Sequence, residues 1–396
     1  MLRPTQKRVT VMKKTTILLC LACLFFASCD WLGKKNEISH FPFKESKRDN
    51  WGLVDDKGRV LYDDMFESSP TPVVNGIFFI DNWDDGETKI EMFSIDKPNT
   101  PIGGTYVEIL PFHEKVTPCV KKGEGIKYID KKGIVRFILP SKYCQAYAFS
   151  NGYSIIAKRS ENDDYDYVYD AISTNGEIIS FTKYTIMSAI GRNNFLVVEK
   201  DNTNKAHIVN RKGEIKYSLK DFPTEYLEPY PELVNQIFSP NLKYYIYMVD
   251  NAYNYCGIRS INGEIILKAK EERPMVFDSN GNLLFAQDES EEIGVMDIHG
   301  NILIKPQYKN MHSTGGGLYV AQKEKNDKYG LINEKGEELI PFDYYYMRPV
   351  SSRAVLVQED NYDDDYILLD KNGRVLGEYA EFSSWEPFYV KSDYRD

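Results

Sequence analysis

The segment WGLVDDKG at residues 51–58 returns, with substitutions, as YGLINEKG at residues 329–336. Both copies follow one pattern: an aromatic residue, a glycine, two apolar residues, Asp or Asn, two polar residues and a final glycine. Self-similarity at a fixed spacing is the signature of a repeat architecture. The pattern therefore decides the fold of this chain, although it names neither a reaction nor a ligand.

Turn glycines mark the register of the repeat. They occur at Gly58, Gly133, Gly176, Gly213, Gly263, Gly300, Gly336 and Gly373. The last four are 37, 36 and 37 residues apart, and the gap of 75 residues between the first two leaves room for one more unit. We interpret MFSIDKPN at residues 92–99 as that unit, with Asn99 in place of glycine, because Asn also tolerates a left-handed backbone. The count is nine units.

Each unit is predicted to contain about four β-strands. Asp or Asn, two polar residues and then Gly is typical of a type I turn followed by a left-handed residue, a common hairpin connection. Short β-branched runs flank the turn, such as Leu53-Val54 before it and Val60-Leu61 after it, which favours strands over helices. The best helical candidate, Glu225–Gln236, contains two prolines, so we interpret it as an inserted loop with at most one helical turn.

The predicted fold is all-β, a repeat array over residues 51–391 followed by a short tail, 392–396. A β-propeller is preferred because radial repetition leaves only short, protected strand edges. Nine blades exceed the usual range of about four to eight, so an open β-spiral or solenoid is the alternative. The residues His40-Phe41-Pro42-Phe43 lie ahead of the array. They either belong to a tether or form a strand that pairs with the last unit and closes the ring.

The N-terminus has the anatomy of a secretory signal. Lys13-Lys14 precede an apolar run, Ile17–Ala27, that is too short to span a bilayer comfortably. The run ends in Phe26-Ala27-Ser28-Cys29, which resembles the lipobox of bacterial lipoproteins. That resemblance implies a signal peptide at residues 1–28, acylation of Cys29 and a tether at residues 29–50. Because several acyl chains anchor firmly, we expect a lipid-anchored protein of the bacterial cell envelope, at the outer membrane.

Signal cleavage makes the chain more acidic. It removes five basic residues and no acidic one, which changes the formal net charge from −10 to −15. A protein of this charge does not suit nucleic acid or anionic lipid headgroups as partners. Cys119, Cys144 and Cys256 then remain beside Cys29. We expect buried free thiols, with a Cys119–Cys144 bridge between adjacent units as the alternative.

No catalytic or metal-binding constellation stands out. The five histidines are scattered over different units, and none lies at metal-ligand spacing from another His or Cys. His207 falls in an apolar strand and His299 in a turn, so we interpret both as structural or solvated. Nucleophile-elbow and phosphate-loop patterns are also missing. We therefore predict a protein without enzymatic activity, metal or cofactor.

Acidic clusters recur between the last strand of one unit and the first strand of the next. Their candidate binding residues are Asp84, Asp85, Asp163, Asp164, Asp363, Asp364 and Asp365. Basic residues such as Lys57, Lys131 and Lys335 favour the glycine turn instead. These two loops lie at opposite ends of the strands, which predicts one acidic rim and one more basic rim. The acidic rim either binds a cationic or metal-bridged partner or simply keeps the sheet protein soluble.

The repeat resembles the bacterial WG repeat, named for the pair present here as Trp51-Gly52. Other units keep only its glycine, as in Ile293-Gly294 and Tyr329-Gly330, or replace it, as with His207. The resemblance covers about residues 50 to 391 and implies a β-repeat interaction module with no defining enzymatic activity. We therefore expect a scaffold that binds an unknown protein or glycan. The alternatives are a glycan-active enzyme with two carboxylates at the propeller axis and a purely structural envelope component.

Overall fold

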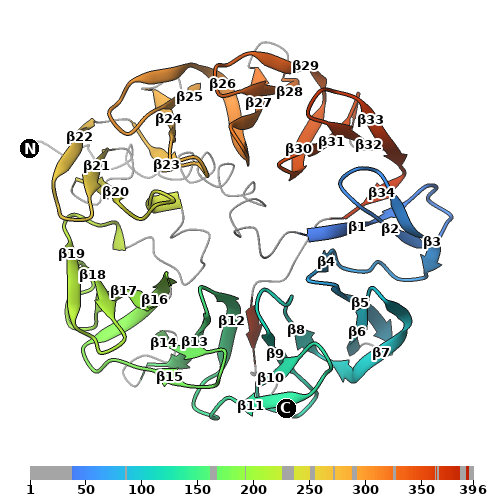
Figure 1. The fold of residues 1–396 in the computed structure, drawn as a ribbon, viewed down its shortest axis with the longest axis horizontal. Coiled ribbons are helices and arrows are strands. Elements are labelled where there is room, and N and C mark those ends of the chain that lie inside the picture. Colours follow the sequence, from blue (N-terminus) through green and yellow to red (C-terminus); the bar gives the residue numbers. More distant parts are fainter. Residues whose placement is uncertain are drawn as a thin grey trace, which may run out of the picture.

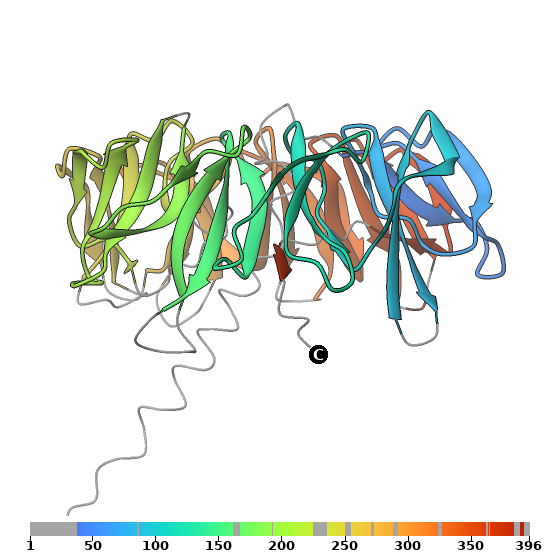
Figure 2. The same cartoon turned by 90° about the horizontal axis from the view of Figure 1, so that it is seen from below.

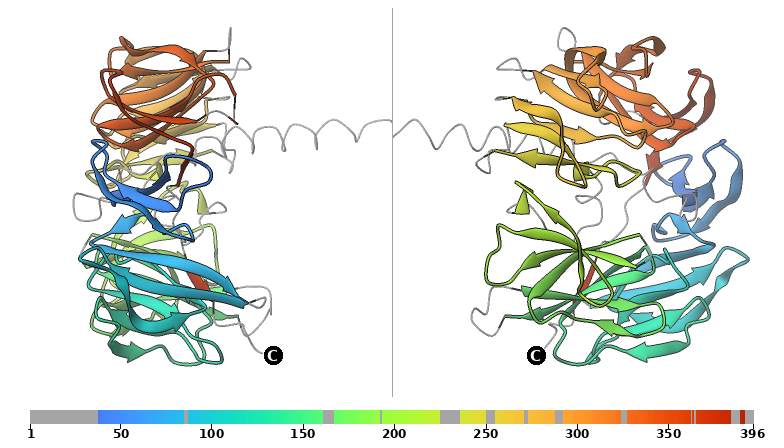
Figure 3. Two further views of the ribbon diagram at one scale, coloured as in Figure 1. Left: turned by 90° about the vertical axis from the view of Figure 1, so that its right-hand side faces the viewer. Right: turned by 60° about the vertical axis from the view of Figure 1, so that its left-hand side comes forward.

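The strands of the chain form nine antiparallel blades arranged as a ring (Figure 1). This computed structural model describes residues 38–84, 87–160, 167–191, 193–224, 236–249, 255–270, 273–287, 292–323, 327–361, 363, 365–383 and 389–391. The ring is flat and one blade high (Figure 2), and neighbouring blades stand face to face (Figure 3). The fold is an all-β propeller, as predicted, rather than an open spiral.

In six blades, consecutive strands run in chain order from the centre of the ring to its periphery (Figure 1), and the start of β1 also pairs with β4 of blade 2. Blade 2 contains β4 (Val73–Val74), β5 (Ile77–Asp84), β6 (Glu87–Ser94) and β7 (Lys97–Tyr106). Blade 3 contains β8 (Glu108–Ile109), β9 (Val116–Val120), β10 (Lys127–Asp130) and β11 (Val135–Ile138). Blade 4 contains β12 (Gln145–Ser150), β13 (Tyr153–Arg159), β14 (Tyr167–Ser173) and β15 (Ile178–Ile179).

The remaining three of these blades follow the same plan. Blade 5 contains β16 (Tyr184–Ile190), β17 (Asn194–Glu199), β18 (Ala206–Asn210) and β19 (Ile215–Leu219). Blade 6 contains β20 (Tyr244–Met248), β21 (Cys256–Ser260) and β22 (Ile265–Lys270), with Phe238 bridging to Tyr245. Blade 9 contains β30 (Tyr346–Ser351), β31 (Ala354–Gln358), β32 (Tyr366–Asp370) and β33 (Val375–Tyr379).

Blades 7 and 8 share one long strand, β26 (Ile302–Gly315), which is outermost in blade 7 and innermost in blade 8. Blade 7 begins with β23 (Met275–Phe277), β24 (Leu283–Gln287) and β25 (Glu292–Met296). Blade 8 continues with β27 (Leu318–Lys323), β28 (Tyr329–Asn333) and β29 (Glu338–Tyr344). The shared strand joins the two blades into one seven-stranded sheet.

Blade 1 closes the ring with strands from both ends of the chain. It consists of β34 (Glu381–Phe382), β1 (Ile38–Lys44), β2 (Trp51–Val54) and β3 (Val60–Phe66). Phe43 of β1 pairs with Gly52 on one side and with Phe382 on the other. Of the two alternatives for His40-Phe41-Pro42-Phe43, the structure shows the closing strand, so the tether predicted at residues 29–50 overlaps blade 1. After blade 1 the chain ends in β35 (Tyr389–Lys391), which adds to β12 of blade 4.

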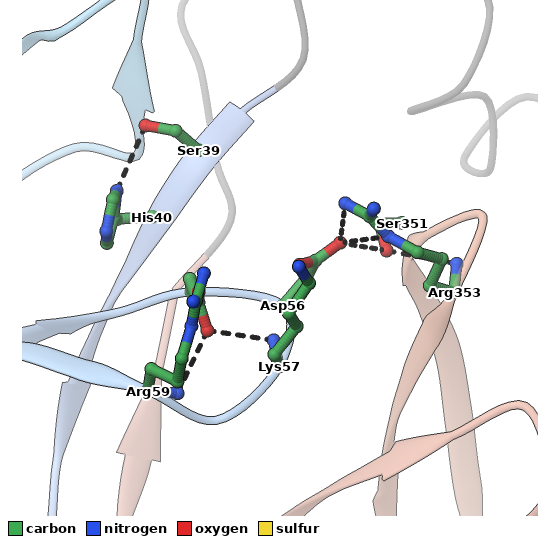
Figure 4. A network of polar contacts seen from close by, with 8 residues as sticks. Ser39, His40, Asp56, Lys57, Arg59, Ser351 and Arg353 are labelled. Carbon is green, nitrogen blue, oxygen red and sulfur yellow. Dashed lines mark hydrogen bonds and ion pairs between the residues drawn. The ribbon is translucent and has the colours of Figure 1, made fainter.

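An ion pair between the β2–β3 turn and the β30–β31 turn reinforces this closure (Figure 4). The Asp56 carboxylate of blade 1 accepts hydrogen bonds from Arg353 Nη2 at 2.8 Å, Arg353 Nε at 3.0 Å and Ser351 Oγ at 2.9 Å, all from blade 9. Asp56 is buried, so its charge depends on these donors. The first and last blades are thus held together by a strand pair, by the polar contact of Asp56 with Arg353 and Ser351 (the polar latch), and by a shared apolar cluster.

Apolar side chains fill every seam between neighbouring blades. Eight buried clusters cover the nine seams. The largest spans two seams, from Leu196 in blade 5 through Tyr245 in blade 6 to Phe285 in blade 7. The cluster between blades 9 and 1 contains Phe43 and Leu356. Because burying one such side chain is worth about 1.5–3 kcal/mol, stability comes mainly from blade-to-blade contact, as in other repeat proteins.

The eight turn glycines adopt the predicted left-handed conformation, with φ between 73° and 90°. In each turn the glycine N–H donates to the carbonyl three residues earlier, as Gly58 does to Asp55. The Asp55 side chain also accepts the N–H groups of Lys57 and Arg59, both at 2.9 Å. Burial opposes ionisation of Asp55, but hydrogen bonds from Arg59 and Lys57 outweigh it and lower the pKa of the carboxyl.

The predicted turn at Asn99 is wrong. Asn99 lies within β7, and Ser94 pairs with Lys97 across a two-residue loop, Ile95-Asp96. A two-residue hairpin has no position for a glycine three residues after its first turn residue. Blade 2 places its glycines later, at Gly103 and Gly104, where β7 bulges. The unit itself is present, so the count of nine is correct.

The glycine of the WG pair is explained by a bulge in the outer strand. Trp51 pairs with Phe66 while Leu53 pairs with Tyr62, so β3 has two extra residues opposite Gly52. A Cβ atom on Gly52 would lie 2.4 Å from the carbonyl oxygen of Tyr62. A side chain therefore cannot fit beneath the bulge.

Two units without this glycine lack the bulge at that point. His207 pairs directly with Ser218, and Ile367 pairs directly with Glu378, in regular ladders. Gly294, by contrast, repeats the arrangement of Gly52, since Ile293 pairs with Tyr308 and Val295 with Ile304. In these units glycine and bulge occur together, whereas blade 2 bulges opposite Glu91 and Met92 without a glycine in β6.

Other expectations are settled in part. Cys119, Cys144 and Cys256 are free thiols, and the first and last are buried. Most of the expected insertion, residues 225–235, lies outside the described residues, while Gln236 and Ile237 have helical backbone. Within the described part of the chain, no helix is long and apolar enough to cross a membrane. The predicted signal peptide and Cys29 lie outside the described residues.

Candidate functional site

The acidic loops lie between the second and third strands of their blades, whereas the glycine turns join the third strand to the fourth. Because these two connections leave opposite ends of the third strand, they lie on opposite faces of the ring. Asp363 and Asp365 are exposed on the acidic side. Asp84 ends β5, and only its backbone is described. The remaining rim residues, Asp85, Asp163, Asp164 and Asp364, lie outside the described residues.

Buried carboxylates are spread over different blades, where they accept hydrogen bonds from neighbouring Tyr and Lys side chains. Asp170 in blade 4 accepts Tyr143 Oη at 2.7 Å and Lys158 Nζ at 2.8 Å. Asp278 in blade 7 accepts Tyr319 Oη of blade 8 at 2.6 Å. The residues described here therefore show no facing pair of acids of the kind that a glycosidase uses.

Histidines with strongly altered pKa values are also dispersed. Burial lowers the pKa of His113 in blade 3 to about 4, and burial lowers that of His312 in blade 8 to about 4. Neither lies in a cluster of three or more potential metal ligands, and none occurs among the described residues. Both rings are neutral at physiological pH; His113 is buried, whereas His312 is half-buried.

A belt of exposed apolar side chains runs around the ring, and sequence reasoning did not find it. We call it the outer belt. All of its members lie on or next to the outermost strand of a blade. They are Val60, Leu61, Ile134, Val135, Ile138, Ile215, Tyr217, Ile265, Ile302, Leu303 and Val375. These are all the exposed large hydrophobic side chains of the described residues, so apolar exposure in this part of the chain is confined to the periphery.

The outer belt repeats with the fold. The second residue after the turn glycine is an exposed Val or Ile in six of the eight glycine turns, such as Val60, Ile215 and Val375. The exceptions are Ile178, which is half-buried, and Glu338. This fixed offset was visible in the sequence, but it looked like an ordinary buried strand.

Blade 3 has the densest part of the outer belt. Ile134, Val135 and Ile138 are 49%, 46% and 62% exposed, within five residues of one another along β11. Arg136 lies among them and pairs with Asp130 in the glycine turn. No strand pairs with the outer side of β11 in the described part of the chain, so its apolar side chains and its backbone edge are accessible together.

Comparison with known proteins identifies the repeat. The sequence pattern of the WG containing repeat matches residues 293–328 and 329–362. The chain contains WG repeats. The two matches cover the outer part of blade 7, all of blade 8, which β26 joins to it, and the first two strands of blade 9. Both include a bulge glycine, Gly294 or Gly330, so the WG pattern follows the bulged blades most closely.

Solved structures resemble this WG-repeat protein only distantly. A eukaryotic initiation factor has 12% identity over 87% of this chain and 85% of its own, with a TM-score of 0.48. AztD from Citrobacter koseri has 11% identity over 89% and 98%, with a TM-score of 0.37. Virginiamycin B lyase from Staphylococcus aureus, crystallised with quinupristin, has 17% identity over 63% and 89%, with a TM-score of 0.31. No curated protein sequence matches the chain.

Proposed function

We propose that this WG-repeat propeller is a lipid-anchored envelope lipoprotein that binds a protein partner through its outer belt. The observation that supports binding is the periodic exposure of Val and Ile on the outer strands. Exposed apolar patches on monomeric proteins commonly mark interaction sites. Here the pattern repeats on six blades, which scattered surface hydrophobics would not do.

The chemistry of the outer belt favours a protein over a glycan. Ten of its eleven members are aliphatic, and Tyr217 is the one aromatic residue. A hydrophobic interface core excludes water around aliphatic and aromatic anchors and is surrounded by polar groups. Arg136 within β11 and Lys132 in the preceding turn supply such a polar surrounding in blade 3.

The partner is tested by capture from envelope extracts. Full-length protein, solubilised in a mild detergent, is immobilised as wild type and as Ile138→Asp. We expect a partner that the wild type retains and the blade 3 variant loses. Ile302→Asp, at a similarly exposed belt position on blade 7, is the matched control that maps the contact. A partner retained equally by all three forms would overturn a belt-mediated interaction.

The anchor is tested separately. Cys29 ends a lipobox-like segment and is the predicted acylation site. Wild-type protein expressed in a bacterium is expected to incorporate labelled palmitate and to sediment with membranes. Cys29→Ser is expected to lose both properties while the propeller stays folded. Unlabelled wild-type protein, or a variant that is labelled equally, would refute the lipoprotein assignment.

A further inference from the structure

Three polar side chains of blade 5 form a continuous hydrogen-bonded chain. Glu199 Oε1 lies 3.0 Å from His207 Nε2, and His207 Nδ1 lies 3.1 Å from Ser218 Oγ. They come from the adjacent strands β17, β18 and β19. An acid, an imidazole and a hydroxyl in this order are the elements of a serine nucleophile site.

The strand register explains how these three side chains come together. Glu199 N–H donates to the Lys205 carbonyl, so hydrogen-bonded pairs between β17 and β18 include Val197 and His207. His207 therefore directs its backbone groups toward β17. Its pairing with Ser218 on the other side is the non-hydrogen-bonded kind, in which the two side chains approach most closely. Glycine at this position, as in the bulged units, would remove the imidazole.

The acid fixes the imidazole for proton transfer. The hydrogen bond from His207, followed by the nearby Lys205, lowers the pKa of Glu199, so the acid is an anion that accepts Nε2–H. Nδ1 is then unprotonated and accepts the Ser218 hydroxyl proton. The Tyr184 ring packs edge-on against the imidazole, with centroids 5.8 Å apart, and restricts its rotation.

Ser218 is accessible, and a backbone donor lies next to it. The residue is exposed on β19, the outermost strand of blade 5. Because Ser218 belongs to a non-hydrogen-bonded pair, its own N–H points away from β18, toward the open sheet edge. The N–H group of a nucleophilic serine is one of the donors that stabilise an acyl-transfer oxyanion.

We propose that Ser218, His207 and Glu199 form an acyl-transfer site that hydrolyses short-chain carboxylic esters. Ser218 Oγ bonds to the ester carbonyl carbon while its proton passes to His207 Nδ1. The carbon–alkoxide bond then breaks, and the alcohol leaves with that proton. Water attacks the acyl carbon, giving a proton to Nδ1, and the carboxylic acid leaves as Ser218 regains its proton. Glu199 is a positioning residue that acts through His207.

A short acyl group fits the surroundings of the hydroxyl. Ser218 lies at an open strand edge, where a large acyl chain would have little to bury against. The substrate is therefore an ester of a small acyl group. In serine proteases the acid contacts Nδ1 and the serine contacts Nε2, whereas here Glu199 contacts Nε2 and Ser218 contacts Nδ1. In either order the imidazole can accept the serine proton and pass it on.

Covalent labelling tests the nucleophile. Full-length protein in membranes is treated with a biotinylated fluorophosphonate, and the modified peptide is identified by mass spectrometry. We expect modification of Ser218, lost in Ser218→Ala and in protein denatured beforehand. Ser218 is exposed, so its alanine variant is expected to fold normally. Absence of label at Ser218, or equal labelling of His207→Gln, would overturn the proposal.

Turnover of p-nitrophenyl acetate tests the relay. His207→Gln is expected to lower kcat by about 100-fold or more, whereas His299→Gln, in an exposed turn, is expected to behave as wild type. Glu199→Gln is expected to lower kcat more than KM and to shift the pH profile, which a merely structural residue would not do. Hydrolysis that is unchanged in Ser218→Ala would show that imidazole alone reacts with the ester. That result would overturn the site even if the belt still binds a partner.

Discussion

Replacing Gly294 by alanine would measure how strongly the WG glycine shapes a blade. A Cβ atom there would lie 2.6 Å from the Ile304 carbonyl oxygen, 2.7 Å from the Pro306 nitrogen and 3.0 Å from Pro306 Cδ. Two of these atoms belong to the backbone of β26, which cannot retreat without losing the bulge. Gly294 does not have a positive φ, so the cost is steric rather than conformational.

The magnitude follows from two opposing effects. Forcing extra atoms into a well-packed interior costs about 1–3 kcal/mol, and three contacts at or below 3.0 Å place this site at the upper end. Alanine in a strand recovers about 0.5–1 kcal/mol relative to glycine. We therefore expect Gly294→Ala to lower the free energy of unfolding by about 2 kcal/mol.

Urea denaturation, followed by far-ultraviolet circular dichroism and tryptophan fluorescence, provides the assay. Gly125→Ala is the matched control, because a Cβ there meets no atom within 4 Å and its φ is not positive. We expect the control to change stability by less than about 0.5 kcal/mol. If Gly294→Ala were equally harmless, steric exclusion beneath the bulge would not be the reason for the WG glycine.

Three further outcomes follow from the polar groups. Asp56→Ala should lower stability by about 1–3 kcal/mol by removing charged hydrogen bonds to Arg353, and limited proteolysis should then cut blade 1 first; an intact blade 1 would argue against the latch. Hydrogen bonds from Ile134 and Arg136 outweigh burial and lower the pKa of Asp130 below its ordinary 3.8. The stabilisation is therefore complete above that value and lost as pH falls through the lowered pKa. When the midpoint urea concentration of unfolding is plotted against pH, Asp130→Asn should therefore show a smaller fall at acidic pH than the wild type. His113 is held neutral by burial, with its pKa lowered from 6.5 to about 4, so its stabilisation is present above pH 6.5 and lost as pH falls toward about 4. His113→Gln should remove that slope, and an unchanged slope would place its origin elsewhere.

Much of the fold could be predicted because each turn encodes its own geometry. Asp55 and Gly58 specify a turn by local hydrogen bonds and a left-handed φ, whatever surrounds them. The turn predicted at Asn99 was wrong because the repeat spacing points to that position, whereas a shorter hairpin at Ile95-Asp96 reverses the chain before it. Spacing locates a unit, but it does not choose between hairpins of different length.

The candidate sites could not be predicted in the same way. Val60 and Ile215 look like buried strand residues, because β-branched side chains favour strands whether or not a neighbour covers them. Their exposure depends on which strand ends the sheet, a property of the closed ring. Glu199, His207 and Ser218 are separated by eight and eleven residues and meet only through the register of three strands.

Blade 1 has a consequence for biogenesis, since its inner strand β34 is synthesised only after β1–β33. During synthesis the polypeptide would hold eight complete blades, and a blade 1 without its inner strand, until residues 381–382 had been added. A premature stop anywhere upstream would leave apolar faces at both ends, open to chaperones and proteases. Only full-length molecules would then escape quality control.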